Sequence, residues 1–141
     1  MKNTDLYFTD DAIIIKESYM VLCLPYHDIL FFQLNSSYIT IGLIREKSVF
    51  IRSSLSLILK AVPKAFYLCN RNTILNMLYV KSIVDDKVVT ISNNECFTLS
   101  RRKRNLFVDY LLQIKKNPIS CCKCFCCNLS SVCKSNFKNA V

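Results

Sequence analysis

Short apolar runs separated by polar clusters make up most of the chain, and this pattern predicts a mainly β protein. The two strongest runs, residues 29–34 and 38–44, flank the turn-type cluster Asn35-Ser36-Ser37. Further short β-prone runs cover residues 12–15, 19–24, 48–51, 66–69, 73–75, 87–92 and 96–99. The runs do not alternate with helices, which argues against a parallel α/β sheet. We expect roughly ten mostly antiparallel strands in small sheets, with two short helices.

Both helices are predicted from apolar residues that recur at a spacing of three and four. In the first segment these residues are Leu55, Ile58, Leu59 and Val62, and in the second they are Leu106, Phe107, Tyr110, Leu111 and Ile114. Either Ser53 or Ser54 is expected to cap the first helix, which Pro63 follows. Ser100 is the candidate N-cap of the second helix.

Three polar residues, Asn70, Arg71 and Asn72, interrupt the apolar stretch from residue 66 to residue 83. Side chains that donate and accept hydrogen bonds, held between two β-prone runs, suit contact with nucleic-acid edges or phosphates. A polar turn that only joins two strands is the alternative interpretation. The stretch alone does not decide between them.

Four cations, Arg101, Arg102, Lys103 and Arg104, follow the candidate cap Ser100. In the first turn of a helix they would oppose the helix dipole, at a cost of about 0.3–1 kcal/mol each at low salt. A bound polyanion would remove this conflict. The cluster therefore favours contact with phosphates.

Charge is distributed unevenly along the chain, whose formal net charge is +9. Residues 1–50 carry four cations and six anions. Residues 51–100 carry six cations and three anions, and residues 101–141 carry nine cations and one anion. Such a gradient favours a polyanionic partner, either nucleic acid or an anionic membrane surface. The chain has no apolar run of about 18 residues, so no membrane span is predicted and a cytoplasmic location is the default.

Six of the nine cysteines fall within residues 121–133, and among them Cys121, Cys124, Cys126 and Cys127 are candidate ligands of a soft metal. Their Cys-x-x-Cys pairs overlap, whereas a structural zinc knuckle needs two separate pairs. A mobile reduced tail, metal binding and redox sensing all remain open. The other three cysteines, Cys23, Cys69 and Cys96, lie in apolar patterns and are expected in the core.

Features of an enzyme are scarce. The single histidine, His27, lies beside Asp28 and has no serine or cysteine partner nearby in the sequence. The single glycine, Gly42, lies inside a predicted strand, so no glycine-rich phosphate loop can form. We expect neither catalysis nor a cofactor.

Several of these features, taken in order, resemble the LytTR family of bacterial DNA-binding domains. The resemblance runs from Pro25 to Gln113 and rests on Asp28-Ile29 with Phe31-Phe32, Ser36-Ser37-Tyr38, Ser54-Leu55, then Arg71, Ile74, Asn76 and Ile83, and finally Ser100-Arg101. It implies a transcriptional regulator with an elongated β fold that inserts loops into successive major grooves of double-stranded DNA. The implied contacts are Ser37, Arg71 and Arg101. The chain departs from the family pattern at Gln33, Leu68, Asn70 and Asn72.

The expected organisation has three parts. Residues 1–24 supply N-terminal strands of the same domain, residues 25–116 the LytTR-like unit, and residues 117–141 a cysteine-rich, mobile tail. So few residues before the resemblance suggest a stand-alone unit. A homodimer on direct-repeat or paired sites and a separate signalling partner are expected. The alternative function is protein interaction or metal handling through the tail.

Overall fold

A computed structural model describes residues 4–85 and 88–116. They form eleven strands, two α-helices and two short 3-10 helices. The strands are β1 (Asp5–Phe8), β2 (Ala12–Glu17), β3 (Met20–Pro25), β4 (Ile29–Asn35), β5 (Tyr38–Leu43), β6 (Val49–Ile51), β7 (Phe66–Asn70), β8 (Thr73–Asn76), β9 (Val80–Val84), β10 (Val88–Ile91) and β11 (Cys96–Thr98). The helices are η1 (Tyr26–Asp28), α1 (Leu55–Ala61), η2 (Met77–Tyr79) and α2 (Arg104–Lys116).

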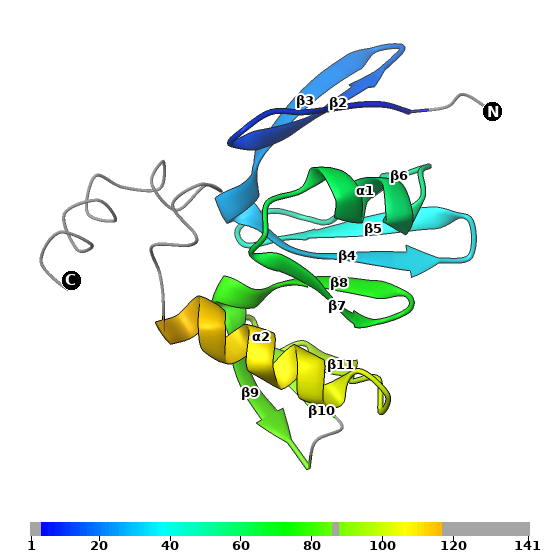
Figure 1. Ribbon diagram of the computed structural model, residues 1–141. Helices are drawn as coiled ribbons and strands as arrows, with labels where there is room; N and C mark the ends of the chain where they lie inside the picture. The colour runs from blue at the N-terminus through cyan, green and yellow to red at the C-terminus, as the bar shows by residue number, and fades with distance from the viewer. Residues whose placement is uncertain (1–3, 86–87, 117–141) are drawn as a thin grey trace, which may run out of the picture.

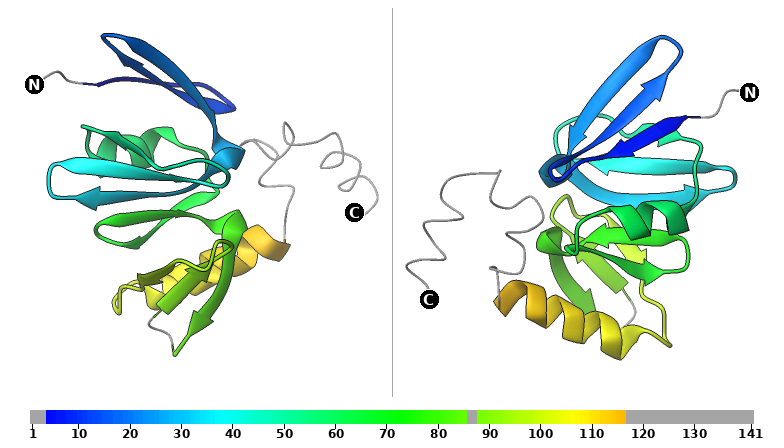
Figure 2. Two further views of the ribbon diagram at one scale, coloured as in Figure 1. Left: turned by 180° about the vertical axis from the view of Figure 1, so that it is seen from behind. Right: turned by 45° about the horizontal axis from the view of Figure 1, so that its top comes forward.

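The strands form three small sheets that follow one another along the molecule (Figure 1). The first has the order β1-β2-β3, the second β6-β5-β4-β8-β7 and the third β11-β10-β9. Every strand pair is antiparallel. The two further views in Figure 2 show the same succession of sheets. The predicted class, a mainly β protein of small antiparallel sheets with two helices, is confirmed.

Helix α1 begins where the sequence places it. The Oγ of Ser54 accepts a hydrogen bond from the backbone N–H of Leu57 at 3.2 Å, so Ser54 is the cap. Leu55 and Ile58 are buried. The helix ends at Ala61, two residues before Pro63, because proline cannot continue the backbone hydrogen-bond pattern.

Buried side chains lie on both faces of β4, the middle strand of the five-stranded sheet. On one face the ring of Phe32 packs against Phe66 at 5.6 Å. On the other, the ring of Phe31 packs against Phe97 of the third sheet at 5.0 Å. Apolar contact across β4 therefore holds the second and third sheets together.

The first sheet is anchored through Tyr26. Its backbone N–H donates to the carbonyl of Asp11 at 3.0 Å, and its hydroxyl donates to the carbonyl of Thr9 at 3.0 Å. Burial, with Asp11 and Asp10 adding to it, raises the pKa of Tyr26 to about 12. Ile13 and Ile15 of β2 lie in the same buried cluster as Tyr26.

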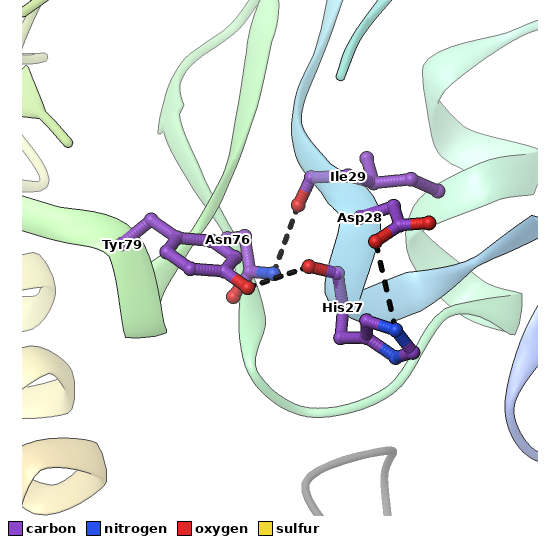
Figure 3. A network of polar contacts seen from close by, with 5 residues as sticks. All are labelled: His27, Asp28, Ile29, Asn76 and Tyr79. Carbon is purple, nitrogen blue, oxygen red and sulfur yellow. Dashed lines mark hydrogen bonds and ion pairs between the residues drawn. The ribbon is translucent and has the colours of Figure 1, made fainter. Parts of the chain in front are cut away.

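Asn76, at the end of β8, joins three segments (Figure 3). Its side chain is fully buried, and its Nδ2 donates to the carbonyl of Ile29 at 2.9 Å while its Oδ1 accepts from Leu78 N–H at 3.1 Å. Beside it, the hydroxyl of Tyr79 donates to the carbonyl of His27 at 2.5 Å. These bonds hold η2 against η1 and the start of β4.

Some local predictions are wrong. The run predicted from residue 19 begins one residue later, at Met20, because Ser18 and Tyr19 form the hairpin turn, and β1 is not among the predicted runs. Of the three cysteines placed in the core, Cys69 is buried but Cys23 and Cys96 are exposed. Both cysteines lie in strands that bury only one face. An apolar run alone therefore does not predict whether a given side chain faces the core or the solvent.

Residues 117–141, including Cys121, Cys124, Cys126 and Cys127, lie outside the described residues. Within the described part of the chain, no group of His, Cys, Asp or Glu is placed to hold a metal ion. No helix among those same residues is both long and apolar enough to span a membrane.

Replacing Asn76 tests its bridging role. We expect Asn76→Ala to lower the free energy of unfolding by about 2–4 kcal/mol, because the Ile29 carbonyl and the Leu78 N–H would have no buried partner. Chemical denaturation measures the change, with Asn105→Ala on the exposed face of α2 as the control. An Asn76→Ala protein within about 0.5 kcal/mol of the parent would contradict the assignment.

Gly42 supplies a second stability prediction. A Cβ added at Gly42 would lie 2.1 Å from Cε2 of Phe31, whose buried ring packs on Phe97. We expect Gly42→Ala to cost about 1–3 kcal/mol of unfolding free energy through overpacking. Denaturation of Gly42→Ala, Phe31→Leu and the double variant should show strong non-additivity, since the smaller side chain removes the clash. Additive losses would show that the two residues do not interact.

Candidate nucleic-acid interface

Three connecting segments that carry the predicted contact residues lie along one margin of the molecule. They are the β4–β5 turn, the β7–β8 turn and the segment that enters α2, all on the right in Figure 1. The left view of Figure 2, seen from behind, places all three on the left. The structure thus brings together segments that are far apart in the sequence.

The β4–β5 turn consists of Ser36 and Ser37 between the paired residues Asn35 and Tyr38. Ser36 has a φ of 56°, the left-handed conformation that a tight hairpin turn requires. Ser37 is exposed at the tip. A predicted contact residue therefore lies on a short turn, whose position is set by the two strands.

Backbone hydrogen bonds fix the β7–β8 turn relative to its neighbours. The N–H of Leu34 donates to the carbonyl of Asn72 at 2.8 Å, which ties the turn to the end of β4. The N–H of Ser100 donates to the carbonyl of Cys69 at 2.9 Å, which ties β7 to the entry of α2. Consequently the three segments cannot move independently.

Arg71 and Asn72 are both exposed in this turn, whereas the side chain of Asn70 is held in place. The Oδ1 of Asn70 accepts from Asn72 N–H at 2.9 Å, and its Nδ2 donates to the carbonyl of Thr98 at 2.6 Å. Asn70 thus shapes the backbone on both sides of Arg71 and anchors it to β11. It holds the turn in position and leaves Arg71 available for a ligand.

Cys69 shares the Thr98 carbonyl with Asn70. Its Sγ donates to that oxygen at 3.2 Å, and burial raises the pKa of the Cys69 thiol to about 12. The thiol is therefore protonated at neutral pH and acts as a hydrogen-bond donor. Two donors on one carbonyl join β7 to the third sheet.

A groove of about 450 Å³ lies between the end of β4, the β7–β8 turn and β11. Its lining includes Arg71 and four side-chain amides, those of Gln33, Asn35, Asn70 and Asn72. None of the described residues that line it is Asp or Glu. Amides and a guanidinium without a nearby carboxylate offer hydrogen bonds to base edges or phosphates.

Asn35, Gln33 and Thr98 are parts of this groove that the sequence analysis did not select. The sequence predicts Asn35 only as part of a turn; in the structure it ends β4, and its Nδ2 donates to the Oγ1 of Thr40 at 3.0 Å. Gln33 donates to the Oγ1 of Thr73 at 3.3 Å. One sequence feature could have identified Asn35 as a groove residue: it is polar and directly precedes Ser36-Ser37, the predicted contact turn.

The cation cluster differs from its prediction. Helix α2 begins at Arg104, not directly after Ser100, and the preceding residues form a turn in which Lys103 N–H donates to the Ser100 carbonyl at 3.2 Å. Ser100 is therefore not the N-cap. Arg101, Arg102 and Lys103 are exposed in that turn, and only the half-buried Arg104 lies in the helix. The predicted conflict with the helix dipole thus concerns Arg104 directly, and the other three are exposed cations of the segment that enters α2.

Comparison with known proteins shows the family and the fold. The family model of the LytTr DNA-binding domain matches residues 19–112. Among solved structures, the fold is similar to the LytTr DNA-binding domain of a protein described as a putative methyl-accepting/DNA response regulator from Bacillus cereus. The TM-score is 0.64 at 18% identity, over 73% of this chain and 98% of that one. None of the curated proteins matches the chain.

The family match spans most of the described residues and includes all three segments at the shared margin. The fold of the Bacillus cereus domain is similar although the two sequences are only 18% identical. This chain belongs to the LytTR family of DNA-binding domains.

Proposed function

We propose that the protein binds specific sequences of double-stranded DNA as a transcriptional regulator, with its turns entering the major groove. The observation that carries the proposal is the alignment of three turns, each with a predicted contact residue, along one margin (Figure 1). Membership of a DNA-binding family supports the ligand class. The B-DNA major groove is about 12 Å wide and admits such protruding elements.

In this proposal Arg71 contacts base edges. Its side chain is exposed at the tip of a turn whose backbone is held by Asn70 and by the Leu34–Asn72 bond. A guanidinium can donate two hydrogen bonds to O6 and N7 of guanine. Because the turn is already ordered, binding costs little conformational entropy. Ser37 and Arg101 would make corresponding contacts from the other two turns, and Asn72 a contact beside Arg71.

Arg102, Lys103 and Arg104 would contact phosphates. Arg102 and Lys103 are exposed in the segment that enters α2, and Arg104 follows them at the start of the helix. Phosphate contacts position a protein on the duplex without selecting its sequence. They complement the base contacts, since they set the register from which the turns reach the bases.

The proposal extends to organisation on DNA. Residues 25–116 would form the DNA-binding unit, joined to the N-terminal strands of residues 1–24. Two copies would occupy direct-repeat or paired sites, and a separate protein would deliver the signal. A preferred site obtained by selecting duplexes from a random pool with the purified protein would show whether it contains one element or two.

Arg71→Ala tests the base contact. We expect it to weaken binding to the selected site by about 1–3 kcal/mol and binding to random duplex much less. The control is Arg45→Ala, since Arg45 is also exposed but lies in the loop after β5. Titrations of both variants against specific and random duplexes measure the difference. Equal affinity of Arg71→Ala and the parent for the specific site would refute this role for the turn.

Neutralising Arg102 and Lys103 together tests the phosphate contacts. We expect the double alanine variant to bind all duplexes more weakly, because fewer counterions are released from the DNA. The slope of log K against log salt should become shallower by about 0.9 for each phosphate that the variant no longer neutralises. The control neutralises Lys16 and Lys47, two exposed lysines of the N-terminal half. A salt slope that changes equally in both double variants would indicate a general charge effect without localised contacts.

A further inference from the structure

A second groove, of about 430 Å³, lies between the end of α1, β7 and the first turns of α2. Both helices contact β7, which is the edge strand of the five-stranded sheet. Neither the β4–β5 turn nor the β7–β8 turn lines this groove, so it is separate from the groove that contains Arg71. A volume of this size accommodates several side chains of a ligand.

The floor of this helix–strand groove is aromatic and already ordered. The rings of Tyr67 and Tyr110 are stacked, with centroids 4.3 Å apart and an interplanar angle of 15°. The hydroxyl of Tyr110 donates to the carbonyl of Lys64, which fixes α2 against the loop before β7. A preformed apolar floor reduces the ordering cost of binding.

Leu106 lines the same groove and remains 61% exposed. Its neighbour Phe107 is fully buried in the core, so the helix does not need Leu106 for packing. An exposed leucine beside an aromatic floor is apolar surface that a bound partner can remove from water.

The rim of the groove is positively charged. Lys60, Lys64 and Lys103 belong to its lining, and none of the described lining residues is Asp or Glu. An apolar floor surrounded by three cations complements a ligand with apolar anchors and negative charge between or beside them.

We propose that this groove binds an acidic amphipathic segment of another protein, with apolar side chains on the aromatic floor and carboxylates at the three lysines. The chain's own residues 117–141 are a poor occupant, because they carry three lysines and no Asp or Glu. The groove lies outside the β4–β5 and β7–β8 turns and shares Lys103 with the proposed phosphate contacts, but its apolar floor and its other two lysines support the inference without the DNA-binding proposal.

The test selects peptides of about twelve residues from a random display library on the full-length protein. We expect the enriched peptides to carry an excess of Asp and Glu, with at least two large apolar residues three or four positions apart. Binding of a synthetic enriched peptide is then measured by fluorescence anisotropy. Separate titrations with duplex DNA follow DNA binding in the same proteins, so the failure of one proposal can be distinguished from the failure of the other.

Matched variants locate the peptide. Lys60→Glu with Lys64→Glu, and separately Leu106→Ser, should each weaken peptide binding by about tenfold or more. The controls are Lys16→Glu, an exposed lysine of the first sheet, and Leu112→Ser, a 45% exposed leucine on α2; neither residue lines the groove. These controls should bind the peptide as the parent does. Circular dichroism confirms that each variant is folded.

Three results would overturn the inference. One is enrichment of peptides without an acidic excess, and another is peptide binding that the groove variants leave unchanged. The third is a different occupant. If a second copy of the chain occupies the groove, sedimentation will show self-association that Leu106→Ser abolishes. If the tail occupies it, a reduced synthetic peptide of residues 117–141 will compete for the groove more strongly than the acidic peptide does.

Discussion

Hydrogen bonds from side chains to backbone carbonyls join the three sheets, which share no strand ladder with one another among the residues that the structure describes. Asn70 and Cys69 both donate to the Thr98 carbonyl and so connect the second sheet to the third. Tyr26 connects the first sheet to η1 through the Thr9 carbonyl, and Tyr79 connects η2 to η1. Each bond is worth little alone, but the bonds of Cys69, Tyr26 and Tyr79 are partly buried, so leaving one of them unmade would cost more than an exposed bond would. Together the bonds favour one relative position of their segments.

This construction explains how turns can serve as a recognition surface. The β7–β8 turn is fixed on one side by the Leu34–Asn72 bond and on the other by Asn70, so Arg71 projects from a defined backbone. A flexible loop would have to be ordered on binding, at about 1–2 kcal/mol for each residue fixed. Short turns between paired strands avoid most of this cost. In the proposed function, these turns would perform a task for which other DNA-binding proteins use a helix.

The sequence was sufficient for what depends on local pattern and insufficient for what depends on contacts between sheets. The β4–β5 turn, a serine cap on α1 and the class of fold follow from periodicity and turn residues, and the structure agrees. The side on which Cys23 and Cys96 lie, and the true start of α2, depend on tertiary contacts that periodicity does not report. The sequence predicts Asn70 as a contact residue because its neighbours are polar. Only the position of Thr98, 28 residues away, shows that its amide also holds the turn to β11.

The two grooves differ in kind, and Lys103, from the segment that enters α2, lines the second one. In the first groove the guanidinium of Arg71 accompanies amides, which can select among bases, whereas in the helix–strand groove three lysines accompany aromatic and aliphatic side chains, which cannot. An acidic segment in the second groove would neutralise Lys103, one of the cations proposed to contact phosphate. Each ligand would then lower the affinity for the other by the same factor, since coupling between two sites is reciprocal. Under these two proposals, charge shared at Lys103 would be enough to link a protein partner to DNA occupancy, without any change of fold.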